Sequence, residues 1–74
     1  MIEASLLYNF LMTLKNRFLK TFFDLPLSER SNVIASIDEN YISWNVAKIE
    51  IEADTQIGKR VLKFLDKNSL LKEQ

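Results

Sequence analysis

Two carboxylate side chains in the middle of the chain have the spacing of a cation site. Glu50 and Asp54 stand four residues apart. A helix would place both on one face, and hard cations such as Ca²⁺ prefer oxygen ligands. The segment lacks the glycine-containing, carbonyl-rich loop that completes such sites. We therefore expect these carboxylates to lie on a solvated helix face, and we predict no metal site and no cofactor.

Catalytic chemistry has few other candidates. The sequence contains no His and no Cys, which removes the commonest general base and the thiolate nucleophile. Gly58 is the single glycine, so no glycine-rich loop can cradle a phosphate. Carboxylates, Lys, Tyr and Ser remain, and no spacing groups them into a catalytic set. We expect a protein that is not an enzyme.

Three lysines, Lys59, Lys63 and Lys67, recur every four residues near the C-terminus, with Arg60 beside them. On a helix they form a basic stripe that can contact phosphates. The alternative is a solvated helix face. Ten basic and ten acidic residues cancel to a formal net charge of zero, which favours that alternative. A nucleic-acid-binding regulator that uses this helix is therefore a secondary hypothesis.

An aromatic pair provides the best candidate for a protein-binding site. Aromatic residues concentrate at interface hot spots. The surrounding segment 24–54 has seven acidic and two basic residues, a net charge of −5 that suits a basic partner. We predict a partner-binding surface formed by Tyr41, Trp44, Glu50 and Glu52. The alternative is that Trp44 fills the core, while the acidic residues pair with the three lysines of the C-terminal helix.

The longest element that must position these residues is a predicted helix over residues 2–23. Polar residues recur there at spacings of three and four, as one narrow stripe along a helix. Fourteen of the first 23 residues are apolar, so the apolar face exceeds half of the cylinder and needs neighbours on more than one side. We predict a homo-oligomer that associates through Leu7, Leu11, Leu14 and Phe18.

A second, shorter helix is predicted after the first. Pro26 ends the first helix, and Ser28 can cap the next one. Apolar residues from Leu27 to Ile37 would form its inner face, and it would end near Asn40. The two helices would then pack as an antiparallel helical hairpin.

Residues 41–53 fit two patterns. Ile42, Val46 and Ile49 recur at helical spacing, whereas apolar residues at 47, 49, 51 and 53 alternate with charged ones as in a strand. We favour the helix, with Ile42, Val46 and Ile49 buried. A strand would have to pair with another copy, across a dimer, or with another protein, because no tight-turn sequence predicts a second strand in this chain.

A last helix is predicted over residues 56–71, capped by Asp54 or Thr55. Its inner face would hold Ile57, Val61, Phe64 and Leu65. The fold class is therefore mainly α: a single small domain over residues 1–74, built as a helical hairpin plus one or two further helices in a small bundle. The alternative is an α+β fold with one strand at 41–53.

One part of the chain resembles a known class of small proteins. The stretch LKTFFDLPLSER at 19–30, followed by VIASI at 33–37, resembles the helix–LP-x-x-E-R–helix segment of antitoxin-type components of toxin–antitoxin modules. Residues 48–54, which lead into a basic amphipathic helix, are similar to segments of such proteins. The resemblance covers roughly half of the chain. It implies an antitoxin that masks a basic toxin.

The location and the function class follow from these features. No basic region precedes the apolar N-terminus, and no apolar run reaches the roughly 18 residues that a membrane span requires. We expect a cytoplasmic protein without a membrane span. We predict a non-catalytic small regulatory or adaptor protein that acts by protein–protein interaction. The antitoxin and the nucleic-acid-binding regulator are the alternatives.

Overall fold

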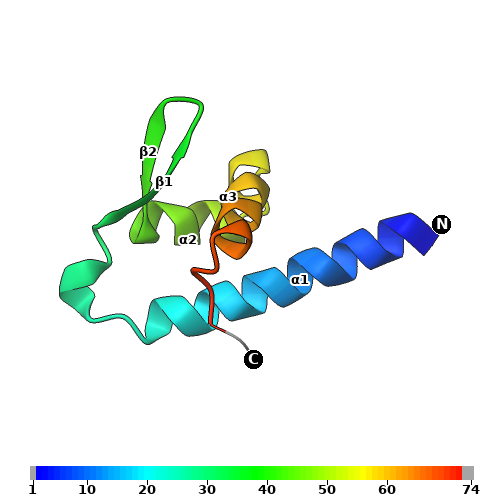
Figure 1. Cartoon of the computed structure of the whole chain (residues 1–74), viewed down its shortest axis with the longest axis horizontal. Coiled ribbons are helices and arrows are strands. Elements are labelled where there is room, and N and C mark those ends of the chain that lie inside the picture. Colours follow the sequence, from blue (N-terminus) through cyan, green and yellow to red (C-terminus); the bar gives the residue numbers. More distant parts are fainter. Residues whose placement is uncertain (1, 73–74) are drawn as a thin grey trace.

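The structure is a computed structural model that describes the backbone of residues 2–72 and the side chains of residue 6 and residues 8–72. A small antiparallel sheet and helices make up this part of the chain, so the fold is mainly α with a minor β component (Figure 1). The elements follow in the order α1 (Ile2–Phe23), a short 3₁₀ helix η1 (Leu27–Glu29), β1 (Val33–Ile37), β2 (Asn40–Ser43), α2 (Trp44–Glu52) and α3 (Gln56–Lys67).

The first helix has the predicted bounds. α1 runs for 22 residues along one side of the molecule, and its C-terminal half lies against the other elements (Figure 1). Leu14, Phe18 and Phe22 are buried on that half. Their spacing of four residues places them on one face of the helix. The N-terminal half projects past the rest of the fold (Figure 1).

The second helix predicted after Ser28 is wrong, and so is the helical hairpin. Only the three-residue η1 forms there, and β1 and β2 then pair as an antiparallel hairpin with Ile37 opposite Asn40. Asp38 and Glu39 make the turn with φ values of 50° and 70°. Two-residue turns of this kind usually contain Gly or Asn-Gly. Because this turn uses two acidic residues, the sequence shows no hairpin signal.

Residues 41–53 are divided between a strand and a helix. β2 ends at Ser43, whose side-chain oxygen accepts a hydrogen bond from the Val46 amide at 3.1 Å and so caps α2. The strand pairs within the chain, not across a dimer. The predicted helix is confirmed over residues 44–52 only, and its predicted inner face is wrong except for Ile42, which is buried but lies on β2. Trp44, Ala47 and Ile51 are the buried residues of α2, whereas Val46 and Ile49 are exposed.

The last helix begins as predicted and ends earlier. Thr55 caps α3 by accepting a hydrogen bond from the Gly58 amide at 2.9 Å. α3 stops at Lys67 instead of residue 71, because Ser69 has a φ of 57° that a right-handed helix cannot continue. The chain then turns back to α1, where the Lys72 amide donates a hydrogen bond to the Thr21 hydroxyl at 2.8 Å.

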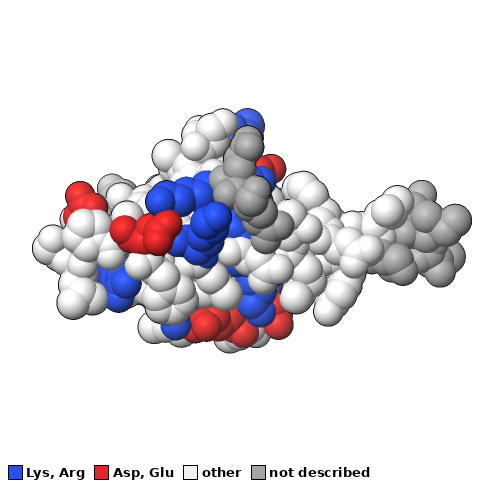
Figure 2. Space-filling view, turned by 90° about the horizontal axis from the view of Figure 1, so that it is seen from below, with Lys and Arg blue, Asp and Glu red and all other residues white. Residues whose placement is uncertain are grey.

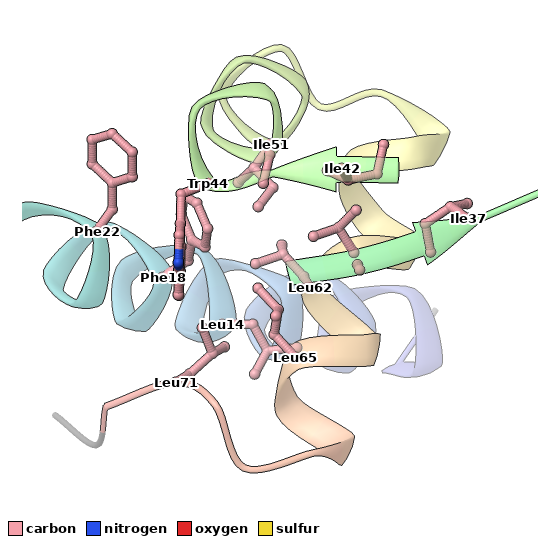
Figure 3. Packing of buried hydrophobic residues seen from close by; sticks show 13 residues of the cluster. Leu14, Phe18, Phe22, Ile37, Ile42, Trp44, Ile51, Leu62, Leu65 and Leu71 are labelled. Atoms are coloured by element: carbon pink, nitrogen blue, oxygen red, sulfur yellow. The ribbon is translucent and has the colours of Figure 1, made fainter. Parts of the chain in front are cut away.

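The core lies where α1, α2 and α3 meet (Figure 3). The Phe18 and Trp44 rings are tilted against each other with centroids 5.8 Å apart. Figure 3 shows Leu62 and Leu65 of α3 beside Leu14 of α1. These residues are all 9% exposed or less, so every helix contributes to one hydrophobic core.

Gly58 permits the close packing of α3 on α2, and we predict that Gly58→Ala destabilises the fold. A Cβ atom at this position would overlap the Glu50 carbonyl oxygen and lie 2.9 Å from the Ile51 Cα. Both are backbone atoms, so relief requires the helices to separate. We expect a loss of about 1–3 kcal/mol in the free energy of unfolding, measured with urea. Gln56→Ala, at an exposed site of the same helix, is the control and should change little.

The hairpin turn should gain stability from glycine. Glu39 has a φ of 70°, a left-handed conformation that costs an L-residue roughly 1–2 kcal/mol and a glycine almost nothing. Glu39→Gly should therefore raise the urea midpoint, although the greater freedom of the unfolded chain offsets part of the gain. A lower midpoint in this variant would contradict the turn geometry.

Candidate protein-binding site

The predicted aromatic anchor is divided between the surface and the core. Tyr41 lies on β2 and is 77% exposed. Trp44 is 9% exposed and packs on Phe18 in the hydrophobic core. Trp44 is therefore not available on the surface as a partner anchor, as the alternative hypothesis had it. The two aromatic residues do not form one binding surface.

The acidic residues expected around that anchor are largely paired within the chain. Glu52 accepts a hydrogen bond from Lys48 at 2.7 Å, and the Glu50 carboxylate accepts one from the Thr55 hydroxyl at 2.6 Å. Asp54 forms an ion pair with Lys15 of α1 at 3.4 Å. The acidic middle of the sequence thus meets basic residues inside one fold. Its cationic partners differ from the predicted stripe of lysines on α3.

Ion pairs also connect distant segments of the chain. Arg60 of α3 binds both carboxylate oxygens of Asp38 in the hairpin turn, and it lowers the pKa of Asp38 from its ordinary value of 3.8. Lys72 likewise lowers the pKa of Asp24, at a distance of 2.7 Å. Both pairs are exposed, so they contribute to orientation more than to stability.

The residues predicted for self-association have different surroundings from one another. Leu14 and Phe18 are 1% and 0% exposed in the chain's own core, so the prediction that they form an association surface is wrong. α2 and α3 cover that part of α1. Leu11 is half-buried and lines a groove. The side chain of Leu7 lies outside the described residues.

A large uncovered apolar surface lies on the N-terminal half of α1, where the side chains of residue 6 and residues 8–12 are described. Residues 4–12 of this half are here called the arm. Four large side chains of the arm are 37–64% exposed: Leu6, Tyr8, Phe10 and Met12. The sequence has no charged residue between Glu3 and Lys15. Figure 2 shows acidic and basic side chains mixed over the body of the molecule, and the described part of the arm without either. An isolated surface helix normally has a charged face, and the arm has only a narrow, uncharged polar stripe.

A groove of about 350 Å³ lies where the arm meets the body. Tyr8, Leu11 and Met12 of α1 line it together with Ile51, Gly58 and Leu62 of the other helices. Lys15, Asp54 and Lys59 complete the lining, and the first two neutralise each other as an ion pair. The groove is therefore mainly apolar, and its apolar surface continues onto the arm.

Another exposed aromatic residue, Phe23, has cationic neighbours, unlike the aromatic residues of the arm. Phe23 is 60% exposed, but the Arg30 guanidinium lies 5.8 Å from its ring centroid and the Lys48 ammonium 5.7 Å. Both distances suit a cation–π interaction. The ring is thus partly screened by hydrated cations. Tyr8 and Phe10 have no charged residue within four positions on either side in the sequence, and Leu6 has only Glu3.

Other candidate sites are weaker. Lys63 and Lys67 are exposed on α3, whereas Arg60 beside them pairs with Asp38 and Lys59 lines the groove. In the described residues, no cluster of three or more His, Cys, Asp or Glu side chains could bind a metal ion. Over the same range, no helix has the length and apolar character needed to cross a membrane.

Comparison of the chain with models of protein families, with curated proteins and with solved structures gives no match. The geometry of the molecule therefore carries the functional argument. Sequence reasoning identified α1 as too apolar for a lone helix, but it assigned the uncovered surface to residues that the core uses. The uncharged stretch from Ala4 to Leu14 was the signal that could have located it.

Substitution of Trp44 and of Tyr41 tests which of these two aromatic residues belongs to the core and which to the surface. Trp44→Ala should cost about 3–5 kcal/mol, which is enough to unfold a domain of this size, because it removes a buried ring that contacts Phe18. Tyr41→Ala should stay within about 0.5 kcal/mol of the wild type. Thermal unfolding followed by circular dichroism measures both. A folded Trp44→Ala protein would contradict the described core.

Proposed function

We propose that this chain is a non-catalytic regulatory or adaptor protein that acts by binding another protein through the arm and its groove. The observation that carries the proposal is the arm, an uncharged helix with four large apolar side chains exposed. Soluble monomers rarely leave contiguous apolar surface of more than a few hundred Å² uncovered. A contiguous apolar surface of a few hundred Å² on a soluble protein is often a functional site.

The overall surface area supports the same proposal. The chain exposes 5123 Å². A compact monomer of 8.7 kDa is expected to expose about 4,700 Å². The projecting arm accounts for an excess of this kind, because a helix that leaves the body exposes its whole circumference. Exposed apolar side chains on such a projecting helix are unfavourable in water, and a partner that covers them would stabilise the helix.

The partner's chemistry follows from the groove. Its lining is mainly apolar, and Lys15 and Asp54 already neutralise each other. The groove therefore selects an apolar segment, with shape as the main source of specificity. The acidic residues predicted to attract a basic protein are largely paired within the chain, so electrostatic attraction plays a smaller part than the sequence suggested.

An antitoxin in the cytoplasm is one specific form of this proposal, supported by the resemblance of residues 19–37. That segment departs from the helix–LP-x-x-E-R–helix pattern it resembles, because residues 33–37 form β1. A nucleic-acid-binding regulator is the other alternative, and the exposed Lys63 and Lys67 on α3 favour it. Binding to duplex DNA that weakens steeply with added salt would support that alternative.

Capture from a lysate of the native host tests the proposal with two matched substitutions. Tyr8 of the arm and Ile49 of α2 are 64% and 65% exposed, so Tyr8→Asp and Ile49→Asp should both leave the chain folded. We expect the tagged wild type and Ile49→Asp to enrich the same protein, other than the chain itself. Tyr8→Asp should lose it, because a carboxylate is desolvated in the groove.

Circular dichroism first confirms that both variants fold. Equal enrichment by all three forms, or no enriched protein, would contradict a binding role for the arm.

A further inference from the structure

We infer that the groove accepts the arm of a second copy of this chain, so that two arms cross in antiparallel orientation in a two-fold symmetric dimer. The inference rests on the proposed function, because it uses the arm and the groove as the binding surface. It assigns the groove to a second copy, so another protein would bind the outer side of the paired arms, and it replaces the buried Leu14 and Phe18 with exposed residues of the arm as the dimer contacts.

The chemistry of the groove matches the arm itself. The groove favours an apolar occupant, since most of its lining is apolar and Lys15 and Asp54 are paired with each other, which leaves Lys59 as the other charged residue of the lining. The stretch from Ala4 to Leu14 has no charged residue, and it is the one uncharged run of this length in the sequence. Within the arm, Leu6, Tyr8 and Phe10 are available to enter a groove because they are 45–64% exposed.

The position of the groove determines the orientation. The groove is lined by residues from Tyr8 to Lys15, which is the base of the arm, and the free tip lies toward residue 2. In an antiparallel pair, each tip reaches the base of the other arm and covers its groove. In a parallel pair, tip would meet tip and base would meet base, so neither groove would receive the tip of the other arm. The antiparallel arrangement is also isologous, so both copies bury the same surface and the assembly closes.

The exposed apolar area of two arms is a large part of what a stable dimer buries. Leu6, Tyr8, Phe10 and Met12 expose on the order of 400 Å² between them, if a fully exposed large apolar side chain has about 200 Å². Two copies together therefore bring on the order of 800 Å² of apolar surface. The groove walls and the backbone of both arms add to this area, and specific interfaces bury about 1,200–2,000 Å² in total.

The mass of the purified protein is the first test. Sedimentation equilibrium should show a species of twice the 8.7 kDa chain mass. Tyr8→Asp should raise the dissociation constant by on the order of 100-fold or more, because both copies then bury a carboxylate. Ile49→Asp, with the same exposure on another helix, should remain a dimer. A wild type that stays monomeric at high micromolar concentration overturns the inference.

Cross-linking tests the orientation, and the absence of Cys from the chain makes single-cysteine variants unambiguous. Residues 6 and 13 are both exposed and lie on one flank of α1, two turns apart. A mixture of Leu6→Cys and Thr13→Cys proteins, treated with a short bis-maleimide, should give mainly the mixed 6–13 product. Predominant 6–6 and 13–13 products overturn the antiparallel arrangement. Asn45→Cys, on α2, is the control and should give no cross-linked dimer.

The two proposals fail in different ways. A monomeric wild type, together with loss of capture in Tyr8→Asp, overturns the dimer and leaves the adaptor function standing. A dimer that Tyr8→Asp dissociates, with no change in capture, supports the inference and contradicts the role of the arm in binding another protein. A monomer that binds phosphatidylcholine vesicles, and loses this binding in Tyr8→Asp, overturns the dimer in favour of a lipid surface.

Discussion

The packing of Phe18 on Trp44 is the contact on which the rest of the fold depends. Phe18 is in the middle of the covered half of α1, and Trp44 is the first residue of α2. Their rings, with centroids 5.8 Å apart, fix where the hairpin ends and where α2 begins. α3 then packs on α2 through Gly58 and closes the core with Leu62 and Leu65. A chain of 74 residues is too short to form a second, larger hydrophobic core that could stabilise the fold without this contact.

The contact between α1 and the other helices also explains where apolar surface is left over. α2 has 9 residues and α3 has 12, so neither can follow a helix of 22 residues along its whole length. A rise of about 1.5 Å per residue makes α1 roughly 33 Å long, about twice the length of α3. The half of α1 that meets α2 and α3 is buried. The other half retains the same apolar character without a cover, and this mismatch in length produces the arm.

Many charges of the molecule pair with one another within the fold. Lys15 joins α1 to the end of α2, Arg60 joins α3 to the hairpin turn, and Lys72 joins the C-terminal segment to the end of α1. Each pair connects segments that are far apart in the sequence. Because several acidic residues are paired with basic residues of the same chain, they are less available to attract a partner. The uncharged arm and its groove differ most from the charged surface that a protein normally exposes to water. The candidate site therefore emerges from apolar surface, not from a catalytic or charged cluster.

Local chemistry was enough to predict several elements from the sequence. The periodicity of residues 2–23 and the proline at 26 determine α1, because both act within a turn or two of helix. Thr55 determines the start of α3 for the same reason. The lack of His and Cys limits the catalytic chemistry that is available. The excess of apolar residues in α1 indicates that this helix must pack against apolar surface on more than one side. These conclusions require no knowledge of distant contacts.

Tertiary structure decided the rest. The turn at Asp38 and Glu39 adopts a left-handed backbone that acidic residues disfavour on their own, and Arg60, 22 residues further along, binds Asp38 there. A local pattern cannot contain that contact. The buried face of α2 depends on where β2 ends. Each residue turns an α-helix by about 100°, so a helix that began a few residues earlier or later would place different side chains against the core. The positions of α2 and α3 determine which half of α1 is covered. The sequence could therefore indicate that α1 has excess apolar surface, but only the fold could show that this surface lies on the arm.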